Sequence, residues 1–319
     1  MLVTNVVCVV HYVAGGGYQF FIMMCAFSWI FPFLHDMATH GKTRDEAVTT
    51  TTAPNLDRIL SAFLNQKSVL VPKTRFRHFY WAAFVWLVIV LSVAPSLGGG
   101  TQWFKLSTIL LFCHILRRSY ECMCVHRWRK ASRMHIAGYL LGLLHYFLLP
   151  FTFVHLPGCR DATPSLQGST TFMDPSYFYG GVSYVRSLYI SIPVAVFSCW
   201  AQYQQHRHHV MLADLRRPTR KYEGSATGTT YTLPVNGWFR SIVCPHYLAE
   251  ILIYLSFDLL LSAEMQQLTY FWTGQHHWLL LWVTFNLVTS ALMNLRWYQA
   301  NITPVWLMEG KKAIFPGLL

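Results

Sequence analysis

The segment Cys244–Tyr254, CPHYLAEILIY, begins an apolar run that reaches Ser262. A lipid-facing helix should avoid His246 and Glu250, because ionisable side chains are costly in a bilayer and usually face a cavity or a partner. His246, Glu250 and Tyr254 are spaced four residues apart, so a helix would place them on one face. Glu250 would then lie about 6 Å deeper than His246. The segment therefore predicts a membrane helix with a polar face.

The composition of the whole chain is also that of a membrane protein. Its 319 residues are 54% hydrophobic and 12% charged, whereas soluble domains contain about 25% charged residues. Seven apolar runs are long enough to cross about 30 Å of hydrocarbon: residues 5–34, 79–97, 104–125, 135–156, 183–204, 242–262 and 277–300. We expect an all-α, polytopic bundle of seven transmembrane helices. Residues 1–319 would form a single domain, because no connection is long enough to fold a second core.

The distribution of the +12 net charge predicts the orientation in the membrane. Lysine and arginine gather in the connections after the first, third and fifth runs and in the C-terminal tail, whereas the alternate connections hold only Arg160. By the positive-inside rule the N-terminus is lumenal and the C-terminus is cytosolic. The basic residues thus indicate topology and do not predict a nucleic-acid partner. The formal glycosylation sequon at Asn301 would lie on the cytosolic side and remain unmodified.

A second polar cluster lies in residues 113–124, CHILRRSYECMC. Arg117 and Glu121 are four residues apart, and His114 lies one turn deeper. One interpretation is a structural ion pair that reaches toward water at the interface. The other is the wall of a polar pocket shared with His246 and Glu250, which the common cytosolic side of the two clusters favours.

The third cluster, in residues 202–217 (QYQQHRHHVMLADLRR), contains three histidines but does not predict a metal site. Neighbouring helical residues point in different directions, and no carboxylate or cysteine completes a ligand set. The eight cysteines include no CxxC pair either. Arg216 and Arg217 suit a phosphate better, since guanidinium groups pair with phosphate oxygens through two hydrogen bonds.

Five blocks of the chain together resemble the steroid 5α-reductase family, in its polyprenol reductase branch. They are VPKTRFRHFY (71–80), HILRRSYE (114–121), HVMLADLR (209–216), PHYLAEILIY (245–254) and KAIFPGLL (312–319). A weaker match is Asp36 followed by GKT at 41–43. The blocks keep the family's order from about residue 31 onward.

This resemblance implies a reductase of the endoplasmic reticulum membrane that binds NADPH from the cytosol. It would saturate the α-isoprene unit of a long-chain polyprenol and so form dolichol, the lipid carrier of N-glycosylation. Its partners would be the bilayer and the polyisoprenoid lipid, without an obligate protein partner. The cofactor would be bound largely by residues 183–319. The family's cofactor-binding positions correspond to Arg118, Gln205, His209, Arg216, Tyr231, His246, Glu250, Tyr298 and Lys312.

Three positions depart from the family pattern. Ile115 stands where steroid-reducing members have a tyrosine that touches the substrate carbonyl, which argues against a steroid substrate. Leu295 stands where a histidine usually precedes the C-terminal tyrosine. Lys311 and Lys312 stand where an arginine would normally lead, so a phosphate would meet point charges there.

The chemistry of the reaction favours an aldehyde as the reacting species. Hydride adds readily to an alkene only when a conjugated carbonyl accepts the negative charge, and an allylic alcohol has none. Polyprenal is therefore our expected substrate, although polyprenol stays open. His114 and Asp36 are candidates for the acid that polarises the carbonyl oxygen. His246 and Glu250 would act where the nicotinamide meets the lipid, and no metal is expected.

Two alternative functions remain at this point. One is another reductase of the same fold, acting on a steroid or an enoyl thioester. The other is a seven-helix transporter, for which Asp258, deep in its run, could act as a proton relay. Asp258 could equally be a polar residue satisfied inside the bundle. NADPH binding would separate a reductase from a transporter.

Overall fold

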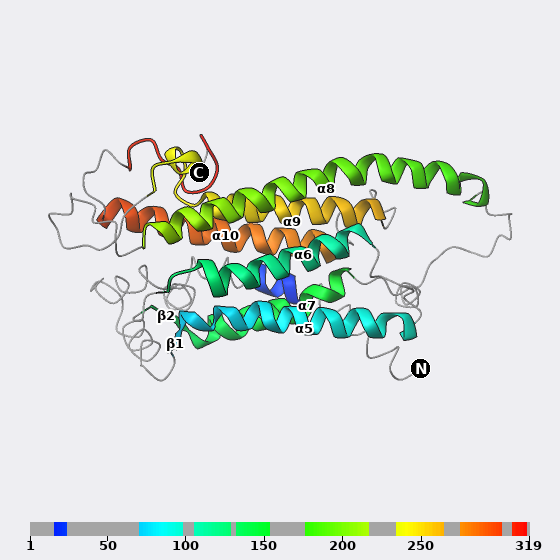
Figure 1. The fold of residues 1–319 in the computed structure, drawn as a ribbon, viewed down its shortest axis with the longest axis horizontal. Coiled ribbons are helices and arrows are strands. Elements are labelled where there is room, and N and C mark those ends of the chain that lie inside the picture. Colours follow the sequence, from blue (N-terminus) through cyan, green and yellow to red (C-terminus); the bar gives the residue numbers. More distant parts are fainter. Residues whose placement is uncertain are drawn as a thin grey trace.

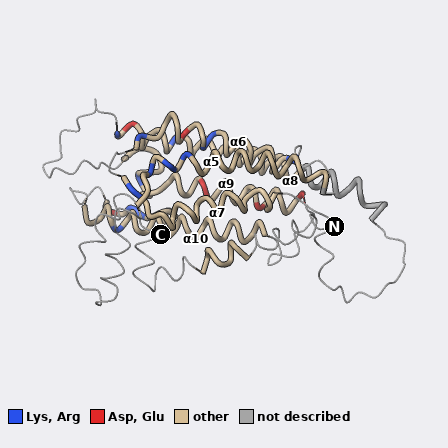
Figure 2. Tube along the Cα trace, turned by 90° about the horizontal axis from the view of Figure 1, so that it is seen from below, with Lys and Arg blue, Asp and Glu red and all other residues tan. Residues whose placement is uncertain are grey.

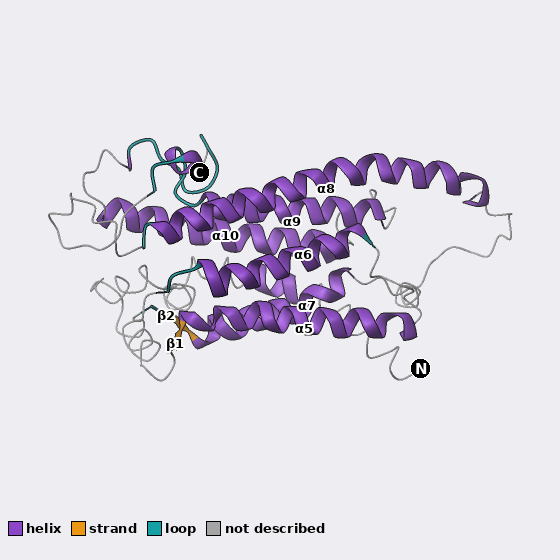
Figure 3. Ribbon diagram, in the orientation of Figure 1, coloured by secondary structure: helices purple, strands orange, loops and turns teal. Residues whose placement is uncertain are grey.

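The computed structural model describes residues 16–23, 70–97, 105–128, 132–153, 176–216, 234–264, 275–301 and 308–317. This part of the chain is mostly helical, as predicted (Figures 1 and 3). Its long helices are α5 (Arg77–Val93), α6 (Leu106–Tyr120), α7 (Ile136–Phe153), α8 (Ser176–Asp214), α9 (Pro245–Glu264) and α10 (Gln275–Asn301). Residues 16–23 add a short helix.

Four of the described helical segments are long and apolar enough to cross a membrane. They are Lys73–Ser96, Ile136–Phe153, Pro245–Glu264 and Gln275–Asn301, and they correspond to four of the predicted runs. The runs at 104–125 and 183–204 are helical too, but α6 is 15 residues long and has two arginines in its last turn, and α8 carries many polar residues in its C-terminal part. Only residues 16–23 of the first run are described, so seven spans remain a prediction.

Two three-residue strands were not predicted. Strands β1 (Leu70–Pro72) and β2 (Arg133–His135) pair antiparallel, with Val71 opposite Met134. Both of these side chains are buried. The pairing therefore adds two apolar side chains to the core near the starts of α5 and α7. The strands are short because each leads directly into helical structure.

The surface of α5 is that of a helix in lipid. Trp81, Val85, Ile89 and Val93 are exposed, and their four-residue spacing places them on one face. An exposed apolar strip of this kind is unfavourable in water but stable against lipid tails. The opposite face packs on α7, where a Cβ on Gly142 would lie 2.8 Å from the Phe79 ring.

The charged residues of the described part gather toward one end of the bundle. Figure 2 shows most Lys and Arg at the end where residues 308–317 lie. Helices α8 and α9 pack together (Figure 1), and α6 lies against both. The polar ends of α6, α8 and α9 therefore meet near the charged end of the bundle.

Candidate active site

The first turn of α9 is held in place by the C-terminal segment. Val243 N–H donates to the Lys312 carbonyl at 2.8 Å, and Cys244 N–H donates to the Ala313 carbonyl at 3.0 Å. The Lys311 ammonium donates to the Arg240 carbonyl at 3.0 Å. Because these bonds immediately precede Pro245, they fix the position of His246 on the first turn.

Glu250, one turn further along α9, joins three helices. Gln205 of α8 donates a hydrogen bond from Nε2 to Glu250 Oε2. His114 Nε2 of α6 lies 3.5 Å from Glu250 Oε1. On the other side of the His114 ring, Arg117 Nη2 lies 3.2 Å from Nδ1. The two sequence clusters on α6 and α9 are thus adjacent.

Glu121, the first residue after α6, gathers a dense set of polar contacts although it is fully buried. The predicted Arg117–Glu121 pair is present, with Nη1 and Oε1 2.5 Å apart, and Arg118 pairs with the other oxygen at 2.5 Å. His206 and His209 of α8 approach the same carboxylate at 2.9 and 2.7 Å. Glu121 therefore holds two adjacent arginines side by side and ties them to α8.

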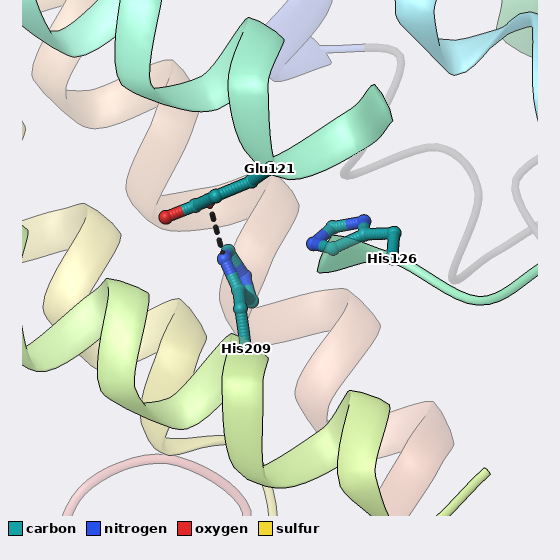
Figure 4. A group of neighbouring side chains, drawn as sticks. All are labelled: Glu121, His126 and His209. Carbon is teal, nitrogen blue, oxygen red and sulfur yellow. Dashed lines mark hydrogen bonds and ion pairs between the residues drawn. The ribbon is translucent and has the colours of Figure 1, made fainter. Parts of the chain in front are cut away.

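Figure 4 shows how Glu121, His126 and His209 converge. Burial lowers the pKa of His209 to about 4, with a further contribution from Arg118, and burial lowers the pKa of His126 to about 3. Both imidazoles are therefore neutral at neutral pH. Although the three side chains lie close enough to share an ion, both Glu121 oxygens are already paired with guanidinium groups. This arrangement disfavours a cation.

A cavity of about 460 Å³ runs along these groups. At its outer end it is bordered by side chains from the ends of helices and from loops, namely Lys73, His126, Arg127, Trp128 and Arg216. Arg118, His209, His246 and Glu250 line its middle part. The outer half is thus rich in cations and imidazoles, which favours an anionic ligand.

The inner half of the cavity is apolar and aromatic. Its lining includes Tyr254 of α9, which lies eight residues beyond His246, about 12 Å along the helix. His145 and Tyr146 of α7 and Trp282 and Val283 of α10 complete this end. Trp282 Nε1 donates a hydrogen bond to His145 Nδ1 at 3.2 Å. A ligand that fills the whole cavity must combine a charged part with an apolar part.

Comparison with known proteins shows what this chain is similar to. Residues 170–318, which include α8, α9 and α10, match the family described as 3-oxo-5-alpha-steroid 4-dehydrogenase. Polyprenal reductase 1 of Arabidopsis thaliana is 26% identical over 287 residues, covering 77% of this chain and 81% of that protein. Polyprenal reductase of Saccharomyces cerevisiae is 26% identical over 281 residues, covering 88% and 86%. That of Caenorhabditis elegans is 23% identical over 326 residues, covering 92% of each chain.

The C-terminal part of the chain thus resembles the steroid 5α-reductase family, and most of its length is similar to proteins named polyprenal reductase. These similarities support an oxidoreductase, and the apolar helices support a multi-pass membrane protein. The family match covers the α8 and α9 side chains of the cavity, including Gln205, His246 and Glu250.

The structure brings together most of the site residues predicted from this family. Those that line the cavity are Arg118, Gln205, His209, Arg216, His246 and Glu250. His114 is buried behind Glu250 and does not line it. Tyr298 packs beside Trp297, and Lys312 pairs through its backbone with residues 241–243, so neither lines the cavity. Asp36 and Tyr231 lie outside the described residues.

Several lining residues were not predicted. Lys73 and Tyr80 belong to the block 71–80 that carried the family resemblance, so the sequence held a signal for them. Tyr80 OH accepts hydrogen bonds from Arg118 Nε and Nη2 at 3.1 and 2.8 Å. His145 and Trp282 had no such signal, because each is a single ring with a polar nitrogen inside an otherwise apolar run.

The outer half of the cavity fits a nucleotide cofactor. His246 Nδ1 and His126 Nε2 are buried and have no hydrogen-bond partner among the described residues. Such atoms are costly unless a ligand satisfies them. Four cationic side chains, Lys73, Arg118, Arg127 and Arg216, line the same space. Unpaired imidazoles beside several cations suit a phosphate-bearing molecule.

Proposed function

We propose that this protein is an NADPH-dependent polyprenal reductase of the endoplasmic reticulum membrane, with a lumenal N-terminus and a cytosolic C-terminus. It would saturate the α-isoprene double bond of polyprenal in the route to dolichol for protein N-glycosylation. The observation that carries this proposal is the single cavity, whose cationic outer half is continuous with an apolar, aromatic inner half. Relatives named polyprenal reductase support the same substrate.

The cationic half would hold the dinucleotide. Arg118, Arg127 and Arg216 are suited to its phosphates, with Lys73 as a further point charge. His246, Gln205 and Glu250 lie farther in, where the nicotinamide would reach the apolar half. When bound, NADPH supplies the hydride. The protein's own part is to orient the two molecules and to exclude water from between them.

The inner half favours a polyisoprenoid aldehyde over a steroid. Ile115, at the position where steroid-reducing members carry a carbonyl-binding tyrosine, is fully buried and does not line the cavity. A long isoprenoid chain would instead pack against aromatic rings of α7, α9 and α10. Of the two polyisoprenoid species, the aldehyde offers a conjugated carbonyl to accept the charge of hydride addition, and the allylic alcohol does not.

The direct test is turnover by the purified protein in detergent. With NADPH and polyprenal we expect consumption of NADPH and a saturated α-isoprene unit, detected by mass spectrometry. Polyprenol alone should not react, and a 3-oxo-4-ene steroid should react far more slowly. Reduction of polyprenol without any oxidant would contradict the aldehyde assignment. No change in nicotinamide fluorescence on mixing would favour a transporter.

A further inference from the structure

Several polar side chains along the cavity can donate a hydrogen bond to a carbonyl oxygen, among them Tyr146, Tyr254 and Asn286. His114 is not one of them. Arg117 can only donate, so its contact with His114 Nδ1 leaves the proton of a neutral His114 on Nε2. That nitrogen faces Glu250 Oε1 at 3.5 Å, and His114 does not line the cavity. It supports Glu250 and cannot reach a substrate there.

His145 has the opposite arrangement. The indole N–H of Trp282 is a donor only, and it lies 3.2 Å from His145 Nδ1. Nδ1 must therefore accept, and a neutral imidazole then carries its proton on Nε2. Among the residues that the structure describes, none bonds Nε2, and His145 lines the cavity. Nε2–H is thus a donor of fixed tautomer available to a ligand.

The rings around His145 hold it in position. Tyr146 contacts its ring edge-on with centroids 4.9 Å apart, and Tyr18 packs on it at 6.1 Å. The Tyr254 ring, on the wall that also carries Glu250, lies 6.4 Å away. The Tyr254 hydroxyl could also reach a ligand, but a hydroxyl can accept as well as donate. Of these two groups, His145 is the one whose nitrogen is fixed as a donor.

We propose that His145 is a catalytic residue that donates a hydrogen bond from Nε2 to the carbonyl oxygen of the aldehyde, with Trp282 as its positioning residue. This inference rests on the proposed polyprenal reduction. Hydride addition forms a C–H bond at the β-carbon, breaks the C=C π bond and places the negative charge on oxygen as an enolate. A proton from water then adds at the α-carbon and restores the aldehyde. His145 gains and loses no proton, and it stabilises the charge on oxygen.

The test compares His145→Phe, which keeps a ring but removes the donor, with His145→Gln, which restores an N–H. We expect His145→Phe to lower kcat with polyprenal by about 100-fold or more, the usual loss for one oxyanion donor. NADPH affinity, measured by nicotinamide fluorescence, should not change. His145→Gln should recover part of the rate. His78→Phe is the matched control, because His78 is half-buried at the start of α5, outside the cavity, and should leave kcat unchanged.

A second readout does not depend on turnover. Polyprenal labelled with ¹³C at the aldehyde should show its carbonyl stretch at lower frequency when bound to the wild-type protein without cofactor. His145→Phe should abolish this shift. Trp282→Phe should reduce it, because without the indole N–H the proton of His145 is no longer fixed on Nε2. If the bound aldehyde is shifted but never reduced, the proposed function and the catalytic role both fail, and only the hydrogen bond from His145 to the carbonyl stands. Unchanged kcat and an unchanged stretch in His145→Phe, or a shift lost only in Tyr254→Phe, would overturn it.

Discussion

At the scale of single residues, Glu250 is the carboxylate that both contacts neighbouring helices and lines the cavity. Its carboxylate accepts from Gln205 and faces His114, and it lines the cavity between the cationic and apolar halves. A carboxylate at that boundary can orient the bound molecules only while it stays charged and while Gln205 and His114 keep it in position. The neighbouring His246 also lines the cavity. Its buried Nδ1 has no hydrogen-bond partner among the described residues.

We therefore expect Glu250→Gln and His246→Ala each to lower kcat/KM for polyprenal reduction by about 100-fold or more, equivalent to ~2.7 kcal/mol of transition-state stabilisation. Both variants should still insert in membranes and elute as the wild type does. Glu309→Gln, at an exposed glutamate outside the cavity, is the matched control. Wild-type rates in both site variants would remove this pair from the mechanism.

Residue-level prediction had a signal where an ionisable side chain interrupts an apolar run. His246 and Glu250 were singled out because a bilayer penalises them, and both line the cavity, while their roles stay a prediction. The role of Glu121 as a partner of His206 and His209 was not visible, since those contacts join residues 85 and 88 positions apart. Long-range pairing of this kind depends on how α6 and α8 pack.

At the scale of elements, the close contact of α5 with α7 depends on Gly142. We expect Gly142→Val to lower the stability of the protein by about 1–3 kcal/mol, as overpacking usually does, because its Cβ would meet the Phe79 ring at 2.8 Å. Thermal unfolding in detergent, followed by size-exclusion chromatography, measures the loss.

Two further variants make this result specific. Combining Gly142→Val with Phe79→Leu should recover part of the lost stability, because the smaller side chain leaves room for the valine. Gly16→Ala is the control, since a Cβ there meets nothing within 4 Å. A Gly142→Val protein as stable as the wild type would show that Phe79 moves aside without cost.

The helices were predictable to within a few residues because length and hydropathy determine them. The run at 242–262 became Pro245–Glu264, and that at 277–300 became Gln275–Asn301. The run at 183–204 lies within the longer α8, Ser176–Asp214. Its polar continuation past residue 204 is helical because it packs on α9 and contacts Glu121. Such tertiary support has no signal in local hydropathy.

At the scale of the whole molecule, the orientation remains a prediction from charge. We expect Asn301 to carry no glycan in cells, because the positive-inside rule places it in the cytosol. A sequon introduced within residues 157–178, a connection predicted to be lumenal, should be glycosylated. Mobility shifts on glycosidase treatment report both sites. A glycan on Asn301 would reverse the orientation, and with it the side from which NADPH enters.

The position of the inner cavity determines which substrate concentration its kinetics depend on. The inner half of the cavity is built by α7, α9 and α10, three helices that are apolar enough to lie in the bilayer. The proposed lipid aldehyde would then reach the site from within the membrane and would not need to dissolve in water. Its effective concentration is then its mole fraction among the surrounding amphiphiles. Adding inert detergent at constant total aldehyde should slow the enzyme by surface dilution alone.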